Sequence, residues 1–146
     1  MRILPIIALG SILLCSCGEE EGTGAPGEAP AVPAAEGWPV TTATDGGSYT
    51  VTVNPVAGGI EQNKHFALDV TVVPKDAAGG EFTVKVDADM PAHRHGMNTQ
   101  PEVAGKEAGR YQVDGMLFHM AGEWVIMVDV TRDGKTERAS VPVNVE

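Results

Sequence analysis

Histidine and methionine are concentrated in one short stretch of the chain, residues 89–103, which reads DMPAHRHGMNTQPEV. The whole chain has four histidines and six methionines, and two of each fall between Met90 and Met97. Thioether sulfur is a soft ligand that selects Cu(I), and imidazole binds Cu(I), Cu(II) and Zn(II). The stretch therefore predicts a metal site that favours Cu(I), with His93, His95 and Met97 as primary ligands and Met90 as a further ligand.

A second interpretation of this stretch is a polar loop that holds no metal. His93 and His95 flank Arg94, and a nearby cation disfavours a second cation. The two histidines stand at i and i+2, so they share a face only if the chain is extended there. Met90 precedes a proline at the expected end of a strand, where its side chain could simply fill the core. Both interpretations remain open from the residues alone.

A second cluster of the same residue types lies further on, in GMLFHMAGEW, with Met116, His119 and Met120. We expect this segment to be a strand that enters a turn. If both clusters meet at one end of the fold, they form a mixed histidine–methionine site without cysteine. Met116 and Met120 alternate with Phe118, a spacing more typical of core packing than of ligands. His119 is then expected to point the opposite way.

The elements that must position these residues are strands. From about Trp38 onward, apolar and polar residues alternate, which is typical of half-buried antiparallel strands. Gly-containing turns separate the alternating segments, and Pro142 suits an edge strand. The pattern predicts an all-β domain, an immunoglobulin-like antiparallel β-sandwich of about seven strands. The clearest expected strands are 48–53, 65–73, 81–88, 109–120, 123–131 and 139–145.

The N-terminal residues have a different character. Arg2 precedes an apolar run, Ile3 to Leu14, that is too short to span a bilayer as a stable helix. The sequence Leu14-Cys15-Ser16-Cys17 follows, and it resembles the lipobox of bacterial lipoproteins. That resemblance implies cleavage before Cys17 and lipidation of its thiol. The alternative is an ordinary signal peptide cut near the same position.

These features divide the chain into three parts. We expect a lipoprotein signal peptide over residues 1–16, a lipidated and disordered tether rich in Gly, Pro, Ala and Glu over 17–37, and a β-sandwich domain over 38–146. The protein would then be lipid-anchored in the cell envelope, outside the cytoplasmic membrane, on the periplasmic side if the cell is Gram-negative. Its first partner is the membrane, through the N-terminal lipid.

Cysteine and charge exclude several functions. The two cysteines are Cys15 and Cys17, so cleavage between them and lipidation leave no free thiol, disulfide or cysteine-ligated metal centre in the domain. The formal net charge of −10 repels phosphate backbones, which argues against nucleic acid as a partner. The sequence has no nucleophile motif, no phosphate loop and no recognisable Ser-His-Asp pattern, so we expect no enzymatic activity.

Four segments resemble the YtkA-like domain family, itself similar to the FixH family. They are Met90-Pro91-Ala92-His93, Gly109-Arg110-Tyr111, Met116-Leu117-Phe118-His119-Met120 and Gly122-Glu123-Trp124. The resemblance covers roughly residues 64–130, about half the chain. It implies an extracytoplasmic immunoglobulin-like domain of a family linked to copper handling and respiratory oxidase assembly. The pair His93 and His95 is not assigned to the family as a whole.

Together these observations predict a candidate copper-binding or copper-delivery module that passes Cu(I) to a copper-accepting envelope protein. The alternative is a structural or protein-interaction domain of the cell envelope, in which histidine and methionine fill one end of the sandwich. The residues alone leave open whether the two clusters meet.

Overall fold

The computed structural model describes residues 37–76, 80–107 and 109–146, which all belong to one compact unit, Val32–Glu146. The predicted signal peptide, the predicted lipidation site Cys17 and all of the predicted tether except Gly37 lie outside the described residues. Over the described part of the chain, no helix has the length and apolar character needed to cross a membrane.

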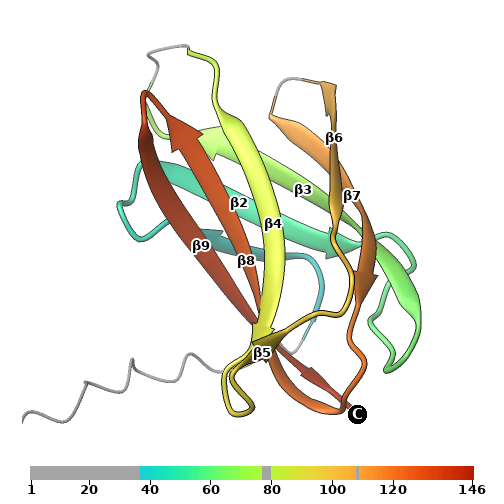
Figure 1. The fold of residues 1–146 in the computed structure, drawn as a ribbon. Coiled ribbons are helices and arrows are strands. Elements are labelled where there is room, and N and C mark those ends of the chain that lie inside the picture. The colour runs from blue at the N-terminus through green and yellow to red at the C-terminus, as the bar shows by residue number, and fades with distance from the viewer. Residues whose placement is uncertain (1–36, 77–79, 108) are drawn as a thin grey trace, which may run out of the picture. The chain divides into compact units, whose positions relative to one another are not determined.

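The described residues form two antiparallel sheets that face each other (Figure 1). One sheet has five strands in the order β1-β2-β3-β7-β6, and the other has four in the order β5-β4-β8-β9. The strands are β1 (Val40–Ala43), β2 (Tyr49–Pro55), β3 (His65–Pro74), β4 (Thr83–Met90), β5 (His95–Gly96), β6 (Glu102–Glu107), β7 (Arg110–Leu117), β8 (Gly122–Arg132) and β9 (Lys135–Val145).

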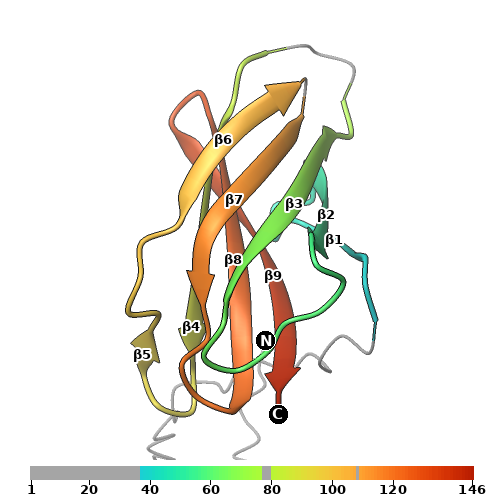
Figure 2. The ribbon, with the colours of Figure 1, turned by 90° about the vertical axis from the view of Figure 1, so that its right-hand side faces the viewer.

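The strand order confirms the predicted immunoglobulin-like sandwich. In that fold, strands A, B, E and D form one sheet and C, F and G form the other. Here β2, β3, β7 and β6 follow the first order, and β4, β8 and β9 follow the second. Strand β1 extends the first sheet beside β2, and β5 extends the second beside β4. Figure 2 shows the two layers from the side, with β6 and β7 in front of β8 and β9.

The apolar face of each strand points into the space between the sheets, as the alternation predicted. In β2 and β3, Val51 pairs with Val72 and Val53 with Val70, and all four side chains are buried. The β8 side chains Trp124, Ile126, Val128 and Val130 cover them from the other sheet, and none is exposed. Side chains directly opposite each other share a face, so each strand pair buries a continuous row.

Three of the nine described strands lie outside the six clearest expected segments, and each lacks a strong apolar pattern. Strand β1 is short, β5 has only two residues, and β6 is an edge strand whose side chains are mostly exposed. Pro142 lies in β9, at the edge of the four-stranded sheet, as expected. Asp133 and Gly134 both have positive φ (51° and 76°) in the β8–β9 hairpin, the geometry of a type I′ turn.

Candidate metal centre

A short hairpin at the end of β4 carries the first histidine cluster. Met90 on β4 is paired with His95 on β5, so the His95 side chain lies on the same face as the buried Met90. Residues 91–94 form the turn, in which the amides of His93 and Arg94 donate to the Met90 carbonyl at 3.0 and 2.9 Å. Met97 follows His95 by two residues and packs against the core. The hairpin therefore directs His95 and Met97 inward.

His93 lies in this turn, and the extended chain considered for residues 93–95 is not present. The Arg94 residue between the histidines has a φ of 55°, which reverses the chain direction locally. The rings of His93 and His95 are nevertheless near each other, with centres 5.8 Å apart. The turn thus achieves the proximity that the i, i+2 spacing would have given in a strand.

The second cluster begins with Met116 in β7 of the five-stranded sheet and continues in the loop after this strand, which carries His119 and Met120. Strand β7 ends at Leu117, and the backbone of the next residues is held by contacts from elsewhere. The Asn63 amide donates to the Phe118 carbonyl at 2.9 Å, and the Gln62 side-chain amide donates to the His119 carbonyl at 3.4 Å. Gly115 has a φ of 81° and breaks the regular strand before it ends.

The expectation that His119 points away from Phe118 and Met120 was wrong. Alternation of side chains holds only inside a strand, and residues 118–120 lie outside one. Both Phe118 and His119 contact the indole ring of Trp124, with ring centres 4.6 and 5.4 Å from it. Because β7 ends before His119, the imidazole turns toward the sandwich end that also holds His95.

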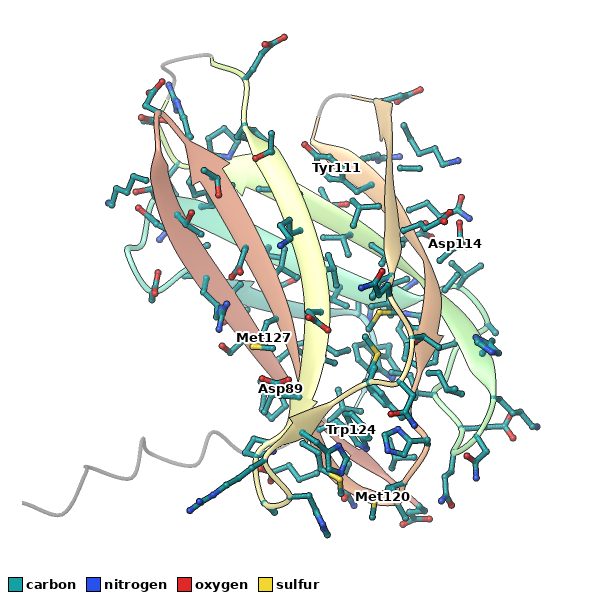
Figure 3. The ribbon with its side chains drawn as sticks, viewed as in Figure 1. Asp89, Tyr111, Asp114, Met120, Trp124 and Met127 are labelled. Carbon is teal, nitrogen blue, oxygen red and sulfur yellow. The ribbon has the colours of Figure 1, made fainter. Side chains whose placement is uncertain are left out.

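Trp124 organises this end of the sandwich. Phe118 stacks on its ring with an interplanar angle of 7°, and the His95 ring lies 6.0 Å away, tilted by 68°. The indole N–H donates to the Met120 carbonyl at 2.9 Å, which fixes the β7–β8 loop. Figure 3 shows Trp124 and Met120 together at this end, below the outward-facing Asp89 and Met127. From the sequence, Trp124 was expected only as part of the 123–131 strand, and its role as a support was missed.

The two histidine clusters meet in space. The rings of His95 and His119 are stacked, with centres 5.2 Å apart and an interplanar angle of 30°. A ring nitrogen binds a metal ion at about 2.0 Å, and the ring centre lies about 1 Å behind it, so two imidazoles on one ion have centres about 5 to 6 Å apart. The His95–His119 and His93–His95 separations both fall in this range.

The hydrogen bonding of the rings determines which nitrogen faces a ligand. The Nδ1 atom of His95 lies 3.1 Å from the Gly96 carbonyl, and a carbonyl only accepts, so Nδ1 carries the hydrogen. The Nε2 atom of neutral His95 then holds the free lone pair, the arrangement common in metal-binding histidines. The Nδ1 atom of His119 is buried and has no hydrogen-bond partner among the described residues, so no such bond selects its tautomer.

Comparison with known proteins places the chain in a family. The model of the YtkA-like family matches residues 44–129, more than half of the 146 residues. The chain belongs to the YtkA-like family. No curated protein and no solved structure matches it. The matched range of this YtkA-like protein includes the β4–β5 hairpin, the β7–β8 loop and Trp124, and so the entire histidine–methionine cluster.

The methionines of the YtkA-like domain lie in three different environments. Met90 and Met116 are core residues, 2% and 0% exposed, as the packing interpretation expected. Met97 and Met120 are only partly buried and pack against the edge of that core. Their sulfur atoms are therefore the ones an ion at the surface could reach. Met127 lies on the outer face of β8, where Arg138 approaches its sulfur at 3.2 Å.

Gly122 gives the Met90 side chain its space at the start of β8. A Cβ atom at Gly122 would lie 2.7 Å from the Met90 methyl carbon, and the φ of Gly122 is 120°, a value that other residues rarely adopt. The glycine of the Gly-x-Trp segment thus lets Met90 fill the core beneath the histidines.

Imidazole and carboxylate alone do not complete a site here. Within residues 37–76, 80–107 and 109–146, no group of three or more histidine, cysteine, aspartate or glutamate side chains is arranged to hold a metal ion. An ion held by two of the histidines would take its further ligands from methionine sulfur, from water or from a partner. This donor set of nitrogen and thioether sulfur is soft, which suits Cu(I) better than Zn(II) or Mg(II).

Proposed function

We propose that this YtkA-like domain binds Cu(I) at the end of its sandwich and delivers it within the cell envelope. The observation that supports this most is the short distance between the His95 and His119 rings, whose centres lie 5.2 Å apart, because it joins two clusters that lie far apart in the sequence. His95 and His119 would bind through ring nitrogens, and Met97 and Met120 would supply sulfur. Met90 and Met116 would support the site by packing.

Partial exposure fits delivery better than storage. His95, Met97, His119 and Met120 are each half-buried, between the core below them and solvent above. A carrier must release its ion to an acceptor, and an ion in a deeply buried site could not be reached by the acceptor's ligands. We propose a binding role without catalysis, with a copper-accepting envelope protein as the partner.

The proposed location rests on the N-terminal sequence. Lipidation at Cys17 would anchor the protein outside the cytoplasmic membrane, and the tether of residues 17–37 would carry the domain away from the lipid surface. Copper handling in such a compartment is consistent with a site that uses methionine and histidine, since neither forms disulfides under oxidising conditions.

A protein-interaction domain without metal is the second candidate. It is favoured by the way Phe118, Trp124 and the two histidine rings form a compact aromatic cluster, which stabilises the end of the sandwich without any ion. In this case the exposed 91–94 turn would be a contact surface for a partner.

Thermal unfolding of the purified full chain with and without Cu(I) tests the proposal. A ligand that binds only the folded state adds about 2.7 kcal/mol when its free concentration is about 100 times Kd. We expect Cu(I) to raise the melting temperature, and His95→Ala to remove most of that increase. An unchanged melting temperature in the parent protein would refute copper binding and favour the interaction domain.

A further inference from the structure

We infer that His95 belongs to two overlapping histidine pairs, and that His93 is the exchange ligand through which Cu(I) enters and leaves. The inference rests on the proposed copper function and deepens it. The inner pair is His95 with His119, against Trp124. The outer pair is His95 with His93, in the exposed turn between β4 and β5.

Distances support two pairs that share one member. Ring centres are 5.2 Å apart in the inner pair and 5.8 Å apart in the outer pair, and both values suit two imidazoles on one ion. Among the described residues, however, no three histidines are arranged around a common point for an ion. The two pairs therefore act as alternatives, with His95 holding the ion in both.

Burial gives the two pairs an order. The His93 side chain is exposed, as are its turn neighbours Pro91, Ala92 and Arg94, whereas His95 and His119 are half-buried. An ion from solvent or from a partner thus reaches the outer pair first. It moves inward when the His93 nitrogen is replaced by the His119 nitrogen, with His95 bound throughout.

Release follows the same path in reverse, as a ligand exchange without redox chemistry. The bond from copper to His119 breaks as the bond to His93 forms, and the His93 bond then breaks as a soft ligand of the acceptor binds. That ligand is a thiolate or thioether, which Cu(I) prefers over imidazole. The copper stays in the +1 state, and His93 leaves as neutral imidazole, so no electron or proton donor is required.

This mechanism predicts a kinetic role for His93 and a thermodynamic role for His95. A group that binds the ion only on the path lowers the barrier in both directions and leaves the equilibrium unchanged. Replacing His93 should therefore slow uptake and release together. Replacing His95 should weaken binding itself.

The test is stopped-flow transfer of Cu(I) between the purified full chain and a chromogenic Cu(I) chelator, with affinities measured by competition. For His93→Ala we expect affinity within about threefold of the parent and transfer slower by about tenfold or more in each direction. For His95→Ala we expect affinity lower by about tenfold or more. His65→Ala is the matched control, since His65 is exposed on β3 and outside the cluster.

Two further outcomes separate the possibilities. His93→Met should restore fast transfer, because a thioether at the same position also binds Cu(I). Equal losses of affinity in His93→Ala and His95→Ala would overturn the inference in favour of a single site, and unchanged transfer rates in His93→Ala would overturn it as well. If the parent protein binds no Cu(I), the proposed function itself fails.

Discussion

The imidazole rings of His95 and His119 stack at 5.2 Å, although His95 lies on β5 of the four-stranded sheet and His119 lies in the loop that follows β7 of the five-stranded sheet. His95 is placed by its pairing with Met90 across the β4–β5 hairpin, and His119 is placed by the early end of β7. Trp124 lies near both rings. Its indole N–H donates to the carbonyl of Met120, the residue after His119, and so holds the loop that carries the second ring. The candidate site therefore depends on this one relationship and on the groups that maintain it.

Methionine substitutions should separate ligands from packing residues. Met97→Leu conserves volume and costs less than about 1.5 kcal/mol of stability, but it removes a sulfur, so we expect weaker Cu(I) binding. Met116→Leu is the matched control, because Met116 is fully buried in the core. It should leave the affinity unchanged. Chelator competition measures the Cu(I) affinity of both variants, and urea unfolding measures their stability. Equal Cu(I) affinities for the two variants would exclude Met97 as a ligand.

Trp124→Phe should loosen the β7–β8 loop. The change removes the indole N–H and leaves the partly buried Met120 carbonyl without its 2.9 Å partner, which costs about 0.5–1.5 kcal/mol, the net contribution of a typical hydrogen bond. We expect lower stability and weaker Cu(I) binding, since His119 rests on the same ring. Trp38→Phe is the control, because Trp38 is only partly buried and lies outside the cluster. Chemical unfolding measures the loss of stability in each variant, and equal losses would contradict a special role for Trp124.

Gly122→Ala should disturb the core beneath the site. The backbone φ of 120° is unfavourable for alanine, at a cost of about 1–3 kcal/mol, and the new methyl group would displace the end of the Met90 side chain. Gly134→Ala is a useful comparison, since Gly134 also has positive φ but open space around it. We expect the Gly122 variant to lose more stability in urea unfolding. A smaller loss than in Gly134→Ala would show that Met90 adjusts without cost.

A buried carboxylate far from the site should make stability depend on pH. The pKa of Glu137 falls from the usual 4.5 to about 2, because its carboxylate accepts hydrogen bonds from Lys135, Ser48 and Thr44. Because the pKa of Glu137 is lower in the folded state than in the unfolded state, its ionised carboxylate stabilises the folded protein at pH values above the unfolded-state pKa. This stabilisation is lost as the pH falls toward the folded-state pKa. The loss should extend from about pH 4.5 to about pH 2.

Glu137→Gln tests this directly by urea unfolding across that range. The variant should be less stable than the parent at neutral pH, and its stability should fall less steeply in acid. Glu102→Gln, a change at an exposed position of β6, should keep the parent's pH dependence. If the stability of Glu137→Gln and Glu102→Gln depended on pH in the same way, the hydrogen bonds to Glu137 would not be the cause of the loss of stability in acid.

The sequence predicts the fold better than the site. The strands with strict alternation, such as β2, β3 and β8, are all present with the expected faces inward. Strand β6 was missed because an exposed edge strand needs no apolar face. Strand β5 was missed because two residues are too few to show a period.

The orientation of His119 could not be predicted because tertiary contacts end β7. Hydrogen bonds from Asn63 and Trp124 hold the backbone of residues 118–120 in a loop. The local sequence contains no signal from which the end of the strand at Leu117 could be predicted. The residue types singled out the histidines, and their role as metal ligands stays a prediction. Only the fold brings His95 and His119 together.

A competition titration of the purified full chain with Cu(I) shows whether His95 and His119 form a copper site. We expect one tight Cu(I) site in the parent protein and a loss of affinity of about tenfold or more in both His95→Ala and His119→Ala. Melting curves of the metal-free variants should show that each still folds. Tight binding that survives both substitutions would mean that copper binds elsewhere. No binding in the parent would leave the stacked histidines as a structural feature of the sandwich end.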